Sequence, residues 1–173
     1  MRNLKSYFTG KRNKRGSIDD LVYIIGTLLA VGLLILLYGK FTDEFNTAIQ
    51  ANEDVPDDGK VAVSQINDLY GGAIDNGFLF LALGLCIAAM VMAMLVIIHP
   101  VFFVFYLIIL TIVIFVSAAM SNIYQEAASN PELADIAAKL VFTSHILTYL
   151  PYITGVFGFI LAIVMYKKWD EAQ

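Results

Sequence analysis

The chain has 173 residues and a formal net charge of −4, and it is 59% hydrophobic but only 15% charged. Soluble domains contain about 45–50% apolar and about 25% charged residues, so this composition is typical of a membrane protein and excludes an ordinary soluble domain. Because apolar segments take up most of the length, we expect one membrane domain and no separate catalytic domain.

A basic arm occupies residues 1–16. It contains six cations and no acid, and four of these cations are Lys11, Arg12, Lys14 and Arg15. Cationic segments beside a membrane span stay on the cytoplasmic side and interact with anionic lipid headgroups. These four residues are therefore our candidates for contact with lipid or with an acidic protein partner. The arm is short and poor in aromatic residues, so we expect no nucleic-acid partner.

A helix start follows the arm. Ser17 suits an N-cap, and Asp19 and Asp20 fall in the first turn, where negative charge complements the helix dipole. The same stretch resembles the class III signal of type IV pilins, and that resemblance implies cleavage between Gly16 and Ser17. The family places an acid at the fifth position after the cut, which here is Leu21, and it follows one helix with a soluble head. We therefore expect residues 1–16 to be retained.

Four membrane-spanning helices are predicted at about residues 19–39, 76–98, 100–124 and 146–167. The central part of each window lacks ionisable side chains. Each window has the roughly 20 residues that a helix needs to cross about 30 Å of hydrocarbon. The second and third spans are separated only by His99 and Pro100, which predicts an antiparallel hairpin. The expected fold is an all-α integral membrane protein, with residues 17–173 forming its membrane domain.

Two segments between the spans are polar. Residues 40–75 form the predicted acidic outer loop, with eight acids against two lysines. The apolar residues at the end of this loop recur at near-helical spacing, which predicts an amphipathic segment that leads into the second span. Residues 131–145 predict an amphipathic helix, with Asn130 as N-cap and Pro131 at the first helical position. This helix should lie at the outer interface or fold back on the bundle. By the positive-inside rule, both termini are expected in the cytoplasm and both acidic segments outside.

No group of side chains predicts catalysis. The single cysteine, Cys86, lies within a span, and the two histidines, His99 and His145, are expected on opposite faces of the bilayer. We therefore expect no enzyme activity, no metal site and no bound cofactor. Spans without ionisable side chains also argue against a pump or coupled transporter, which needs such groups to hold ions.

Small residues stand four apart within the spans, a spacing that lets helices approach closely. The candidate packing pairs are Gly26 with Ala30, Gly84 with Ala88, and Ser117 with Ser121. We expect these pairs to pack within the chain, and homo-oligomer formation is an open alternative.

The chain contains, in order, "KRGSIDDL" at the first helix start, "HP" between two spans, "SNIY" after the third span, "LPYI" before the fourth and "YKKW" at its end. With this layout it resembles small multi-spanning membrane proteins of tailless viruses of bacteria or archaea that have a membrane beneath the capsid. The resemblance implies a structural protein of the virion internal membrane or host cytoplasmic membrane, whose partners are the lipid bilayer and other membrane or capsid proteins. The alternatives are a pore-forming, holin-like protein, a small channel subunit, and a subunit of a cellular membrane complex.

Overall fold

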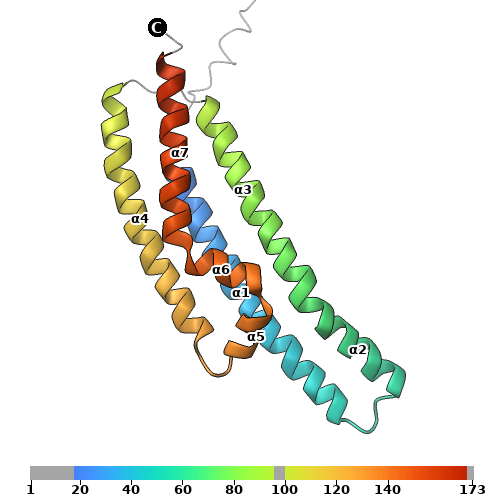
Figure 1. Ribbon diagram of the computed structural model, residues 1–173. Helices are drawn as coiled ribbons and strands as arrows, with labels where there is room; N and C mark the ends of the chain where they lie inside the picture. Colours follow the sequence, from blue (N-terminus) through green and yellow to red (C-terminus); the bar gives the residue numbers. More distant parts are fainter. Residues whose placement is uncertain (1–17, 96–99, 171–173) are drawn as a thin grey trace, which may run out of the picture.

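The computed structural model describes residues 18–95 and 100–170, and the regular elements in these ranges are all helices, which confirms the all-α fold class (Figure 1). They are α1 (Ile18–Ala51), α2 (Asp57–Leu69), the π-helix η2 (Tyr70–Ile74), α3 (Asp75–Leu95), α4 (Pro100–Ala128), α5 (Ala134–Lys139), α6 (Val141–Thr148) and α7 (Leu150–Asp170). The proposed N-cap Ser17 and the turn at His99 lie outside the described residues.

Four helical segments are long and apolar enough to cross a membrane, as expected for an integral membrane protein. They are Leu21–Ala51, Asp57–Val91, Phe103–Ala128 and Leu150–Lys167. Many large apolar side chains on these helices are exposed, and Phe80 and Phe115 are each 73% exposed. An apolar surface of this extent is unsuited to water and fits a lipid environment.

Exposed tyrosines stand near both ends of the apolar parts of α1 and α7. On α1, Tyr23 is 74% exposed and Tyr38 is 55% exposed; on α7, Tyr152 is 72% exposed and Tyr166 is 52% exposed. At 1.5 Å per residue, the two tyrosines of each helix are separated by about 22 Å. Tyrosine is enriched at both membrane–water interfaces, so each pair brackets the apolar part of its own helix.

Two of the helical rods are longer than a bilayer requires. α1 has 34 residues and measures about 51 Å, while α2, η2 and α3 have 13, 5 and 21 residues and together measure about 58 Å. The hydrocarbon layer is only about 30 Å thick. α1 and α2 therefore form a helical hairpin that reaches beyond the ends of α4 and α7 (Figure 1).

The acidic segment 40–75 is mostly helical, which differs from the expected loop. α1 continues to Ala51, and the non-helical part is confined to residues 52–56. Residues 40–51 contain no glycine or proline, and Lys40 and Glu44 form an ion pair of 3.2 Å one turn apart. Lys40 therefore ends the apolar span without ending the helix.

The segment 131–145 also differs from the expected single helix, because α5 and α6 meet at a break. Leu140, which lies between them, is fully buried and has a non-helical backbone (φ −101°, ψ 70°). The predicted helix start was also wrong, because α5 begins at Ala134 after Leu133 and not at Pro131 after Asn130. The side chain of Asn130 instead accepts a hydrogen bond of 3.0 Å from the N–H of Glu132, in the turn before α5. The helical pair folds back against the bundle, and we call residues 139–143 the α5–α6 corner.

Glycines allow two of the close contacts inside the bundle. A Cβ added at Gly158 of α7 would collide with Leu110 of α4, and one added at Gly32 of α1 would collide with Leu147 of α6. The hydroxyl of Tyr106 donates a hydrogen bond of 2.9 Å to the Gly158 carbonyl. Close approach through glycine favours packing between membrane helices.

Candidate functional site at the α5–α6 corner

Asp75, the first residue of α3, is a buried carboxylate bound to the start of α6. Its side chain is 4% exposed, and its two oxygens accept hydrogen bonds of 2.7 Å from the N–H groups of Phe142 and Thr143. The first N–H groups of a helix have no partner within the helix, and negative charge is favourable there. Leu140, at the N-cap position of α6, provides no side-chain hydrogen bond. Asp75 therefore caps α6 from another helix.

The π-helix η2 brings Asp75 to this position. It contains Gly71 and Gly72, and a Cβ added at Gly71 would lie 3.4 Å from the Lys139 carbonyl oxygen. The backbone before α3 therefore runs close to the end of α5. Short π-helical segments are often found at functional sites, where they shift the register of the residues that follow.

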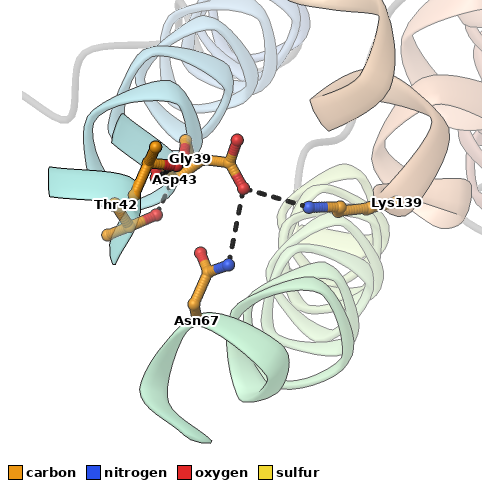
Figure 2. Close-up of polar contacts among 6 residues, drawn as sticks. Gly39, Thr42, Asp43, Asn67 and Lys139 are labelled. Atoms are coloured by element: carbon orange, nitrogen blue, oxygen red, sulfur yellow. Dashed lines mark hydrogen bonds and ion pairs between the residues drawn. The ribbon is translucent and has the colours of Figure 1, made fainter. Parts of the chain in front are cut away.

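Asp43 forms a second carboxylate contact at the same corner (Figure 2). Its Oδ1 lies 3.3 Å from Nζ of Lys139 and accepts a hydrogen bond of 3.4 Å from the side-chain amide of Asn67. One oxygen thus connects α1, α2 and α5. The side chains of Lys139 and Asp43 are 49% and 43% exposed, and exposed pairs contribute only about 0–1 kcal/mol. This contact therefore sets the position of the hairpin more than it stabilises the fold.

α4 holds the corner from a third side. The hydroxyl of Ser144 donates to the Ala137 carbonyl at 2.9 Å, so the Tyr124 hydroxyl donates to Ser144 Oγ, also at 2.9 Å. The Ser121 hydroxyl donates to the Thr148 carbonyl at 2.7 Å. Tyr124 is fully buried. These bonds tie α4 to the middle and to the C-terminal end of α6.

Gly39 marks the contact between α1, η2 and α5. A Cβ added there would lie 2.5 Å from Cγ2 of Ile136 and 2.7 Å from Cε1 of Tyr70. The hydroxyl of Tyr70 donates to the Ile35 carbonyl, and its ring centroid lies 5.6 Å from that of Tyr38. The level of Tyr38 is therefore also the level at which η2 and α5 meet α1.

The polar groups of the corner serve to join helices. Both carboxylates are bound to protein groups, while the Thr143 hydroxyl is buried without a hydrogen-bond partner. Within residues 18–95 and 100–170, no cluster of three or more His, Cys, Asp or Glu side chains could hold a metal ion. Polar groups that satisfy each other hold the helices in position.

Of the residues proposed from the sequence, Ser121 makes one of the contacts described above. The basic-arm residues Lys11, Arg12, Lys14 and Arg15 are outside the described ranges. Ala30, Gly84 and Ala88 are exposed, and a Cβ added at Gly26 or Gly84 would meet nothing within 4 Å. Ser117 and Ser121 are buried; Ser117 donates to the Ile114 carbonyl of its own helix, and Ser121 binds the Thr148 carbonyl.

Sequence reasoning missed the glycines at the close contacts and the role of Asp75. Gly158 and the buried Ala162 stand four apart, so the small-residue pattern contained a signal for that contact. Gly32 and Gly39 have no small residue four positions away. Asp75 is the last of the eight acids in residues 40–75, and nothing near it in the sequence indicates its partners.

No protein-family model, curated protein or solved structure matches the chain. Its function is therefore argued from the residues and their geometry.

Proposed function

We propose that the chain is a structural membrane protein that links a bilayer to a protein shell, in the internal membrane of a virus particle. The observation that carries the structural part of this proposal is the continuous connection between the bundle and the hairpin. α1 continues unbroken from the membrane into the hairpin, and Asp43 and Asp75 hold the α5–α6 corner against both. These contacts link the position of the hairpin to that of the bundle.

The use of buried charge supports a structural role over transport. Transporters place ionisable groups in their spans to hold ions or protons. Among the described residues, Asp75 is the buried charged side chain, and both of its oxygens bind the start of α6. It therefore serves to hold two helices together.

The orientation that we propose puts the basic arm on the cytoplasmic leaflet and the hairpin on the opposite side. A vesicle that forms beneath a capsid keeps its cytoplasmic leaflet outermost, so the arm would face the shell and the hairpin the particle interior. The segment 40–75 carries eight acids against two lysines and would be repelled by the phosphates of a packaged genome. The arm is therefore the element that contacts the shell.

The test replaces Lys11, Arg12, Lys14 and Arg15 by glutamine. Insertion should be unchanged, because Arg2, Lys5, Lys167 and Lys168 still mark the cytoplasmic side. Incorporation into particles should fall about tenfold or more, since four cations each worth up to about 1 kcal/mol are lost. In the native protein, the association should also weaken as salt rises.

The matched control changes two lysines of the hairpin, Lys40 and Lys60, to glutamine and should leave incorporation unchanged. Copy number is measured by quantitative mass spectrometry of purified particles. Unchanged incorporation of the arm variant, without salt sensitivity, would reject the arm as the link to the shell. Depolarisation of cells on expression of the native protein would instead support the pore-forming alternative.

A further inference from the structure

The continuous rod formed by α2, η2 and α3 has a buried contact at each end of its π-helix. Tyr70, the first residue of η2, is 6% exposed, and its hydroxyl donates to the Ile35 carbonyl of α1. Asp75 follows η2 directly, is 4% exposed, and accepts the N–H groups of Phe142 and Thr143 of α6. Two buried side chains therefore stand five residues apart on one rod, and a different helix holds each of them.

The π-helix determines how these two side chains are turned relative to each other. Five residues of α-helix turn by about 500°, which would place Tyr70 and Asp75 about 140° apart around the rod. A single π-turn contains one residue more than an α-turn, so the same stretch turns by only about 400° and the two side chains lie about 40° apart. Both are buried, which agrees with the smaller angle. η2 therefore lets one rod turn both side chains toward the bundle.

The protein holds α3 more firmly than α2. Asp75 makes two hydrogen bonds of 2.7 Å, and Phe78 and Ala82 of α3 are buried. None of the residues of α2 is buried. In the middle of η2, Gly71 and Gly72 have no side chains that would fix the segment in one register. If η2 becomes α-helical, α2 is therefore the part that turns, by about 100°.

Such a turn would undo the contact between α2 and α1. In the π form, the Asn67 side chain donates a hydrogen bond of 3.4 Å to Asp43. In the α form, each residue of α2 takes the angular position that the residue before it has now, so Asp68 would stand where Asn67 stands. Two carboxylates would then face each other and repel. Tyr70 would also turn away from Ile35. The hairpin is therefore docked only while η2 keeps its π form.

We infer that η2 is a release device for the hairpin, with a π form that docks α2 on α1 and an α form that releases it. π-helical turns are far rarer than α-helical ones and occur mostly as single insertions, so the contact of Tyr70 with α1 is what holds this one. Release keeps α3 and the cap of α6 in place and frees α2, in the part of the protein that reaches beyond α4 and α7 (Figure 1). The inference does not depend on the proposed link to a shell.

The test removes the extra residue of η2. Deletion of Gly72 should make η2 α-helical without turning α2, because the residue and the π insertion are lost together. Deletion of Gly77, in the regular helix α3, should turn the preceding part of the rod by about 100°. The two deletions are matched, since a Cβ added at either glycine would meet nothing within 4 Å.

The measurement is the distance between spin labels at Thr47 of α1 and Gln65 of α2, both exposed, in a Cys86→Ala background in proteoliposomes. A turn of about 100° on a helix of about 5–6 Å radius moves the second label by about 8 Å. Deletion of Gly72 should keep the native distance. Tyr70→Ala should change the distance by up to about 8 Å, and deletion of Gly72 in the Tyr70→Ala variant should restore it.

Tyr70→Phe loses only the hydroxyl and should show both distances in one sample. A second pair of labels, at the exposed Tyr23 of α1 and Phe159 of α7, should keep its native distance in both Tyr70 variants, which shows that the bundle is intact. A Gly72 deletion that changes the first distance as much as the Gly77 deletion would overturn the role of η2 in setting the register. Native distances in both Tyr70 variants would overturn the release.

Discussion

Replacing Asp75 by alanine should remove the contact that holds α6 to α3. The native carboxylate accepts two hydrogen bonds of 2.7 Å, from Phe142 and Thr143, and is 4% exposed. A buried donor left unsatisfied costs about 1–3 kcal/mol, and loss of a helix N-cap costs about 0.5–2 kcal/mol. The two costs are not fully additive, because both describe the loss of the same hydrogen bonds. We therefore expect the free energy of unfolding to fall by about 2–4 kcal/mol.

The assay is unfolding of the purified protein by SDS in mixed micelles, followed by circular dichroism. Asp75→Asn retains one carbonyl acceptor and should lose about half as much stability as Asp75→Ala. Asp68→Ala removes an exposed acid from α2 and should change the free energy by less than about 0.5 kcal/mol. If Asp75→Ala and Asp68→Ala unfold alike, Asp75 does not hold α6 and the joint described here is wrong.

Two further predictions concern packing and orientation. Gly39→Ala should lower the free energy of unfolding by about 1–3 kcal/mol, because its Cβ would lie 2.5 Å from Ile136 Cγ2. The control, Gly26→Ala, should not lower the free energy of unfolding, since a Cβ there meets nothing within 4 Å. Equal stability of the two variants in the SDS assay would contradict the contact at Gly39. In a Cys86→Ala background, cysteines at Asp57 and Pro131 should react with a membrane-impermeant thiol reagent in intact cells, and a cysteine at Asn3 should not. The reverse labelling pattern would overturn the proposed orientation.

The spans were predictable from the sequence because each depends on a local property, a long window without ionisable residues. The extent of α1 was not, since Lys40 ends the hydrophobic window but leaves helix propensity intact. The break at Leu140 was also hidden, because an apolar residue within an amphipathic pattern gives no sign of a non-helical backbone. This break lies where contacts between distant segments, such as that of Asp75 with Phe142, decide the structure.

The candidate site was less predictable than the spans for the same reason. Asp75 and Phe142 are 67 residues apart, and each looks ordinary in its own neighbourhood. Of the proposed packing residues, Ser121 bonds to the Thr148 carbonyl across a helix pair, whereas Gly84 faces away from the chain. Residue spacing shows that two helices can approach closely, but it does not say which helices they are.

The long separation between Asp75 and its partners imposes an order on biosynthesis. A ribosome adds about 5–20 residues per second, so the carboxylate exists for roughly 3–14 s before the N–H groups of residues 142 and 143 are made. An uncompensated charge in hydrocarbon would be costly during that interval. Asp75 is the first residue of α3 and lies near the level of Tyr70, so its carboxylate can stay hydrated until residues 142 and 143 have been synthesised. The joint therefore closes only after the third span has been inserted, and the first three spans reach their final arrangement late in synthesis.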